Sequence, residues 1–112
     1  MKRLQAYRDA GADCVFVPGL LDPKTIGRLV YDLGCPLNIL AVPGSASIRE
    51  LAAMGVKRIS LGSGPMRAAF GLLRQLAQEV KADGTYSNMS GAPSHGEMNR
   101  LMSASRKAGT QN

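Results

Sequence analysis

The chain has 112 residues and a formal net charge of +6, a length that fits one domain or part of one and leaves no room for two. Hydrophobic residues make up 45% and charged residues 20%, both ordinary values for a globular protein. Aromatic residues make up only 4%, so the core must be aliphatic. No apolar run approaches the roughly 18 residues that a membrane-spanning helix needs, and we expect no membrane contact.

The positive charge lies singly along the chain, which argues against nucleic acid as a partner. The few aromatic side chains do not alternate with basic ones, as stacking platforms for bases would. Only the stretch 100–112 carries charges of a single sign, from three basic residues and no acidic ones. We therefore expect no nucleic-acid partner, and we interpret residues 87–112 as a loop, a short helix and a flexible basic tail.

Helical and strand-like segments alternate from the N-terminus. Residues 4–10 predict a short helix, and the apolar run 14–17 predicts a strand. Asp22 is a good helix N-cap with proline at the next position, and the helix that it begins should end at Leu33 before a glycine. The apolar stripe of that helix is Ile26, Leu29, Val30 and Leu33.

The same unit then repeats along the chain. We predict further strands over 36–42 and 56–61, and helices over 48–54, 65–81 and 97–105. Ser45 or Ser47 should cap the helix over 48–54. The longest helix places Met66, Ala69, Phe70, Leu73 and Leu76 on one side.

Evenly spaced apolar strands separated by helices indicate a parallel sheet covered by helices, an α/β fold. A doubly wound sheet or a piece of a (β/α)₈ barrel fits this order. The short, equal units favour the barrel, but a complete barrel needs about 250 residues. We therefore predict the C-terminal part of an incomplete barrel over residues 1–86, with open sheet edges and an uncovered apolar inner face. The basic start of the chain enters mid-helix, which favours a truncated gene or a longer natural protein.

The chain has two cysteines and one histidine, and none lies at metal-ligand spacing. Cys14 and Cys35 adjoin apolar strand-like runs, so we interpret both as reduced and structural, in a cytoplasmic protein. His95 lies in a polar stretch rich in glycine and serine, where we expect it to face solvent in a loop.

Three glycine-containing loops follow the predicted strands, at the end where barrel enzymes hold their active sites. They are 17–19, 41–44 and 61–64. Each leads into a helix N-terminus, which favours anions, so Gly19, Pro43 and Gly44 are candidates for contact with a carboxylate or phosphate. The alternative is that these residues only make tight turns.

Asn38 is the only strongly polar side chain in its apolar run, and a buried amide without partners costs roughly 1–3 kcal/mol. It should bond to a side chain of a neighbouring strand, to a water molecule or to a substrate. Ser60 holds a similar position in the third strand and is a further candidate for substrate contact. Arg58 enters that strand early, where a structural ion pair is the better interpretation. No Ser/His/Asp grouping or pair of carboxylates at a strand end suggests a catalytic residue.

Three stretches in order resemble one enzyme superfamily. They are R-x-x-A-Y-x-x-A-G-A-D-x-x-F-V-P-G from Arg3 to Gly19, P-L-N-I-L-A-V-P-G from Pro36 to Gly44, and E-L-A-A-M-G-V-K-R-I-S from Glu50 to Ser60. Together they resemble the isocitrate lyase/phosphoenolpyruvate mutase superfamily, in the branch similar to carboxyvinyl-carboxyphosphonate phosphorylmutase. The resemblance covers about residues 3–86.

The resemblance implies a Mg²⁺-dependent lyase or mutase that acts on C–C or P–C bonds of small 2-oxo or 2-hydroxy carboxylates. It also implies a homo-oligomer formed through the C-terminal helices. The acidic residues that anchor the metal in that family, and its mobile Lys-Lys-Cys-Gly-His-type loop, precede the stretch that matches. We find no counterpart of either in this chain, and expect the segment to be inactive alone. The alternatives are a non-catalytic barrel remnant and a self-associating partial barrel that binds small anions.

Overall fold

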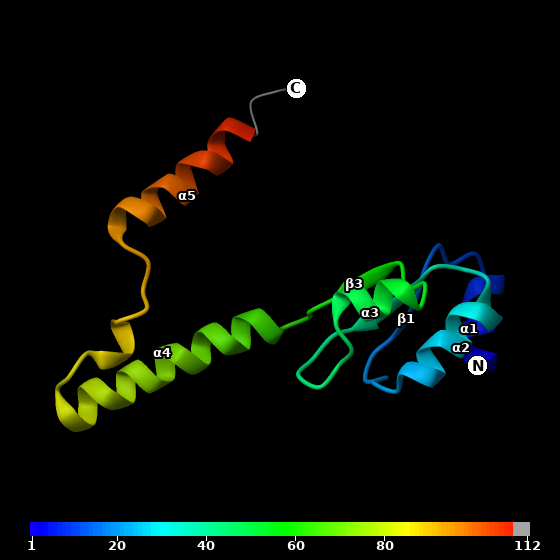
Figure 1. Cartoon of the computed structure of the whole chain (residues 1–112), viewed down its shortest axis with the longest axis horizontal. Helices are drawn as coiled ribbons and strands as arrows, with labels where there is room; N and C mark the ends of the chain where they lie inside the picture. Colours follow the sequence, from blue (N-terminus) through cyan, green and yellow to red (C-terminus); the bar gives the residue numbers. More distant parts are fainter. Residues whose placement is uncertain (109–112) are drawn as a thin grey trace. The chain divides into compact units, whose positions relative to one another are not determined.

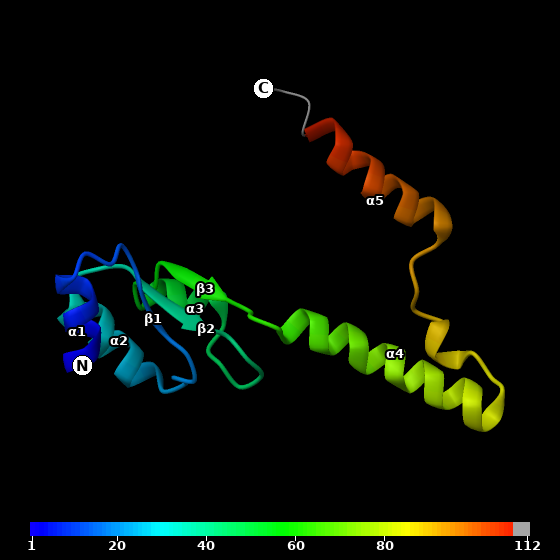
Figure 2. The same cartoon turned by 180° about the vertical axis from the view of Figure 1, so that it is seen from behind.

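The computed structural model describes the backbone of residues 1–108 and the side chains through Ser103. It separates into two compact units, Met1–Arg67 and the part from Ala68 onward. Figure 1 shows the ribbon of both units and labels the five α-helices with β1 and β3; Figure 2 also labels β2. Among the described residues, no helix is both long enough and apolar enough to cross a membrane.

The first unit holds three helix–strand pairs in chain order. Its elements are α1 (Lys2–Asp9), β1 (Val15–Val17), α2 (Pro23–Leu33), β2 (Leu37–Leu40), α3 (Ile48–Ala53) and β3 (Arg58–Ser60). The strands form a parallel sheet in the order β1-β2-β3, and Figure 2 shows them side by side. The register places Phe16, Asn38 and Arg58 in one row across the sheet. The predicted order of elements in this unit is confirmed.

The helix caps follow the sequence. The Asp22 carboxylate accepts a hydrogen bond from the Thr25 N–H at 2.8 Å, and Gly34 ends α2 in the left-handed region at φ 61°. Of the two serines predicted to cap α3, Ser47 does so, through a capping box with Glu50. The Ser45 hydroxyl instead accepts from the Val42 N–H at 2.9 Å and tightens the preceding loop.

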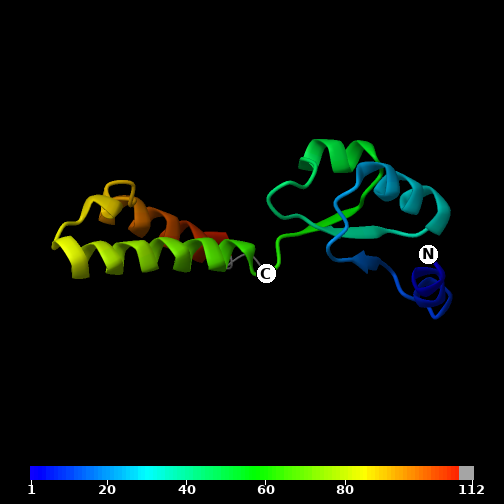
Figure 3. The ribbon, with the colours of Figure 1, turned by 90° about the horizontal axis from the view of Figure 1, so that it is seen from below.

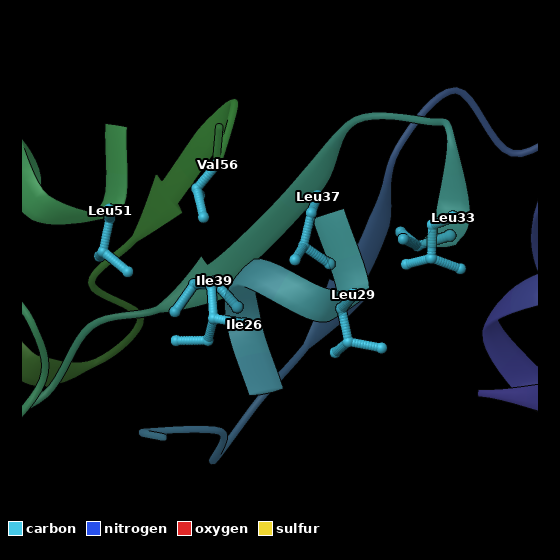
Figure 4. Close-up of a cluster of buried hydrophobic side chains, with 8 residues drawn as sticks. Ile26, Leu29, Leu33, Leu37, Ile39, Leu51 and Val56 are labelled. Atoms are coloured by element: carbon cyan, nitrogen blue, oxygen red, sulfur yellow. The ribbon is translucent and has the colours of Figure 1, made fainter. Parts of the chain in front are cut away.

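One face of the sheet packs against α2 and α3 and makes the core. Figure 3 shows both helices on the same side of β2, and Figure 4 shows their side chains meeting those of the strands. Among the described residues, the buried hydrophobic side chains are Val15, Ile26, Leu29, Leu33, Leu37, Ile39, Leu51 and Val56. The predicted aliphatic core is confirmed, with Val30 packed at its edge.

The other face of the sheet, here called the open face, differs from the expected apolar surface. Alternation along the strands puts five side chains on it, namely Phe16, Asn38, Leu40, Arg58 and Ser60. Phe16 is 46% exposed and Arg58 is also exposed. Three of the five side chains are polar or charged, so the prediction of an apolar inner face is wrong.

The third strand is shorter than its apolar run predicted, because part of that run completes α3. The N–H of Val56 donates to the Leu51 carbonyl at 3.1 Å, and that of Gly55 donates to Ala52 at 2.9 Å. These two bonds form a Schellman motif, and the side chains of Val56 and Leu51 are both buried, as that motif favours. Val56 is therefore a core residue of the helix end and not of the strand.

The helices after the sheet are longer than predicted. They are α4 (Gly64–Asp83), the short 3₁₀ helix η1 (Ser87–Met89) and α5 (His95–Ala108). His95 opens α5, so its predicted place in a loop is wrong. The reason is Ser94, whose side chain accepts from the Glu97 N–H at 3.2 Å and caps the helix. Of the predicted flexible tail, residues 109–112 lie outside the described residues.

The carboxylate of Glu79 binds the segment that follows α4. It accepts hydrogen bonds from the Thr85 hydroxyl at 2.7 Å, from the N–H groups of Ser87 and Asn88 at 2.6 and 2.9 Å, and from the Asn88 side chain at 2.7 Å. The Asn88 N–H first, and then the Thr85 hydroxyl, lower the pKa of Glu79 from 4.5 to about 2. The ionised carboxylate thus holds η1 close to the end of α4.

We expect this contact to open with acid. Because the pKa of Glu79 is depressed in the folded chain, the contact is fully formed above about pH 4.5 and is lost as the pH falls toward 2. The ¹H shifts of the Ser87 and Asn88 amides should titrate together with a midpoint near pH 2. Glu79→Gln should remove this titration. A midpoint near pH 4.5 would show that the carboxylate does not hold these amides.

Candidate functional site

The carboxyl ends of three parallel strands meet at one edge of the sheet, where three loops follow them. Gly19 and Gly44 lie in the first two loops at φ 77° and 91°, and Gly62 lies in the third at φ 54°. Side chains other than glycine rarely adopt these angles, so tight turns account for all three glycines. Pro43 is exposed beside Gly44. Contact of these residues with a substrate stays a prediction.

The helix N-termini beyond these loops are not equally available to an anion. The Asp22 carboxylate lies at the start of α2, and the Thr25 hydroxyl and N–H lower its pKa. Glu50 lies at the start of α3, where the side chain and N–H of Ser47 lower its pKa. Among these three helices, only α4 has no acidic residue at its N-cap position or in its first turn. An acidic side chain thus lies at two of the three helix N-termini, and anion binding at the three loops stays a prediction.

Asn38 and Ser60 form the main polar contact between two strands. The Asn38 amide Nδ2 donates to the Ser60 Oγ at 3.0 Å, and that hydroxyl donates to the Asn38 Oδ1 at 3.1 Å. Asn38 is only 3% exposed. Of the three partners that the sequence left open for Asn38, the neighbouring strand supplies the one observed. Asn38 is the second residue of β2 and Ser60 is the last residue of β3, so the pair reaches from inside the sheet to the start of the third loop.

Arg58 has no acidic partner among the side chains that the structure describes. The two ion pairs found there join Arg8 to Asp9 and Arg28 to Asp32. The structural ion pair predicted for Arg58 is thus not formed within this part of the chain. Arg58 lies next to Asn38 in the register, on the open face.

The residues present do not fit a magnesium site by themselves. Within the described part of the chain, no group of three Asp, Glu, His or Cys side chains lies close enough to hold a metal ion. Mg²⁺ prefers carboxylate oxygens. The first acidic residue after the carboxyl end of β1, Asp22, already accepts bonds from Thr25 as a helix cap.

Both cysteines are free and half-buried, as the sequence predicted for structural thiols. Cys14 lines an open hollow of about 470 Å³ with Tyr7 and Phe16, and Cys35 lines one of about 300 Å³ with Val30 and Lys57. Each cysteine precedes its strand, so both hollows adjoin the amino ends of strands. They lie away from the edge where a barrel enzyme has its active site.

Comparison with known proteins identifies the family. The family model described as phosphoenolpyruvate phosphomutase matches residues 1–81. The chain belongs to the phosphoenolpyruvate phosphomutase family. The predicted superfamily and the predicted fold class, three strands of an incomplete barrel, are both confirmed.

Members of this family and its superfamily resemble the chain over most of its length but are much longer. An uncharacterized protein of Mycobacterium tuberculosis is 42% identical over 80 residues, which cover 71% of this chain and 31% of that protein. A lyase/mutase structure from Burkholderia cenocepacia has 39% identity and a TM-score of 0.84, covering 91% of this chain and 38% of that one. A 2,3-dimethylmalate lyase of the PEP mutase/isocitrate lyase superfamily has 26% identity and a TM-score of 0.69. The match covers 96% of this chain and 41% of that lyase.

The chain thus spans about a third of the length of the curated relatives that it matches. Sequence reasoning placed the strand-end loops and the Asn38 position, but it missed two features. One is the role of Glu79, whose four donors lie six to nine residues later in the chain and form no local motif. The other is the missing acidic partner of Arg58, which depends on every carboxylate in the fold.

Proposed function

We propose that the chain is the C-terminal part of the barrel of a lyase or mutase. The complete enzyme acts on C–C or P–C bonds of small 2-oxo or 2-hydroxy carboxylates and uses Mg²⁺. The observation that carries the proposal is the family match over residues 1–81, which includes all three strands and the loops at their carboxyl ends. Because the described residues do not fit a magnesium site, the metal would be bound by other βα units of the barrel.

The contribution of this chain to catalysis would be to shape one side of the pocket. The turns at Gly19 and at Pro43–Gly44 place backbone groups, with no bulky side chain, at the strand ends. Beneath them, Asn38 and Ser60 form a polar floor whose mutual hydrogen bonds can exchange for bonds to a substrate oxygen. None of these groups is a carboxylate, an imidazole, an amine or a thiol, and among the described side chains no such group lies beside the Ser60 hydroxyl to act as its base, so the proposal assigns no catalytic residue to this chain.

The exposed apolar side of α4 supports an oligomeric state. Met66, Phe70 and Leu73 lie three or four residues apart along the helix and are all more than half exposed. Such a stripe is typical of a helix that packs against another surface. We propose that the C-terminal helices form the contact between subunits, and that the protein, with its free cysteines, is cytoplasmic.

Reconstitution tests the function. The 112-residue chain is assayed alone and after co-expression with the part of the M. tuberculosis relative that precedes the matching 80 residues. We expect no turnover from the chain alone. The complex should cleave 2,3-dimethylmalate or convert phosphoenolpyruvate into a product with a P–C bond, seen by ³¹P NMR, and EDTA should abolish the activity.

The same assay tests the polar floor. Asn38→Leu should raise KM about tenfold, the effect of losing one polar contact with the substrate. A lowered Tm with an unchanged KM would instead show that Asn38 only joins the strands. EDTA-sensitive turnover by the chain alone, or a stable complex inactive on both substrate classes, would contradict the proposed function.

A further inference from the structure

The open face of the sheet carries a positive charge in an otherwise neutral surface. Arg58 lies there beside Asn38 and in the same row as Phe16. The Asn38 amide is already satisfied by Ser60, so it offers the guanidinium no strong acceptor. None of the five side chains of the open face is acidic.

A guanidinium in the interior of a barrel needs a carboxylate. Removing an unpaired charge from water costs several kcal/mol, and an acidic partner with good geometry offsets that cost. No carboxylate in the described part of the chain pairs with Arg58. The helix that follows β3 has no acidic residue before Glu79, and four hydrogen bonds already hold the Glu79 carboxylate.

We infer that the open face docks the βα units that complete the barrel, and that those units place an Asp or Glu side chain against Arg58. This inference rests on the proposed function, since it takes the rest of the barrel as the occupant. The relatives are long enough to contain further βα units, because the matched regions are only 31% to 41% of their lengths. The outer edges of β1 and β3, the two edge strands of the described sheet, are the places where further strands add.

A second copy of the chain fits this face less well. Two-fold pairing brings the same patch of both copies together, so Arg58 would face Arg58 without a carboxylate between them. The net charge of +6 per chain adds to that repulsion. An acidic partner avoids both problems, and Phe16 then becomes buried beside the ion pair.

Co-expression of the tagged chain with the preceding part of the M. tuberculosis relative tests the inference. We expect a complex that contains the two chains in equal numbers, with its mass measured by light scattering and its affinity by titration. Arg58→Glu should weaken it about 100-fold, as reversal of one member of a buried charge pair does. Arg28→Glu is the matched control, since Arg28 is 81% exposed on α2 and pairs only with Asp32; it should change affinity less than threefold.

Arg58→Lys allows the carboxylate to be identified. A carbodiimide should join the introduced amine directly to an Asp or Glu of the relative, and mass spectrometry should locate the bond. To guard against a partner segment that does not fold when separate, the two pieces are also fused in one polypeptide, in which Arg58→Glu should lower Tm more than Arg28→Glu.

Equal effects of Arg58→Glu and Arg28→Glu, both in the two-chain complex and in the fused polypeptide, would overturn the inference. Failure of the relative's part to bind this chain, together with equal effects in the fused polypeptide, would also overturn it. A complex that depends on Arg58 but has no enzymatic activity would support the docking face and contradict the proposed function.

Discussion

Ile39→Ala is expected to lower the free energy of unfolding of the Met1–Arg67 unit by about 2–5 kcal/mol. Ile39 is fully buried at the centre of β2, the middle strand, where it contacts the side chains of α2 and α3 in the core. Truncation removes buried methyl groups and leaves a cavity that the two helices cannot fill without moving. The core has only eight buried hydrophobic side chains among the described residues, so each carries a large share of the stability.

Urea unfolding followed by far-ultraviolet circular dichroism measures this loss. A unit of about 67 residues has a total stability of roughly 3–10 kcal/mol, so the variant should lose a large fraction of that stability. Tyr31→Ala is the control, because Tyr31 is 88% exposed on α2, and its effect should stay within about 0.5 kcal/mol. A cost below about 1 kcal/mol for Ile39→Ala would mean that this core is not packed as described.

Local signals in the sequence were enough to predict the elements around the core. The cap at Asp22, the following proline and the glycine after Leu33 fixed the bounds of α2 to the residue. These signals act over a few residues, and their geometry does not depend on the rest of the fold. The parallel order of the strands also followed, because short helical connections leave few other arrangements.

Features that depend on distant residues could not be predicted in the same way. The open face was expected to be apolar because the strands read as apolar runs, yet the register places Arg58 and Asn38 in one row on it. The partner of Asn38 was left open, since Ser60 is 22 residues away and the sequence does not state which residues face each other. The candidate site was therefore located by its strand ends, while its hydrogen bonds came only from the structure.

Gly55→Ala is the second substitution with a large expected effect, about 2–4 kcal/mol of lost stability. Gly55 ends α3 in the left-handed region at φ 92°, where its N–H and that of Val56 close the helix end. A Cβ atom there would lie 2.9 Å from Cγ1 of Val30 on α2. Two costs therefore combine, namely the strained backbone and the overlap between helices.

Other glycines of the same unit separate these two costs. Gly34 has φ 61° and no atom within 4 Å of an added Cβ, so Gly34→Ala measures the backbone strain alone, about 1–2 kcal/mol. Gly27 lies inside α2 with equal space and no positive φ, so Gly27→Ala should stabilise the chain by about 0.5–1 kcal/mol. The same added methyl group thus has effects of opposite sign at different positions.

A double-mutant cycle with Val30→Ala isolates the overlap. Removing Cγ1 of Val30 leaves room for the Cβ atom, so in that background Gly55→Ala should cost no more than Gly34→Ala does. Thermal unfolding of the four variants of the cycle gives the coupling energy. An unchanged cost of Gly55→Ala in the Val30→Ala background would show that α3 does not approach α2 closely at this point.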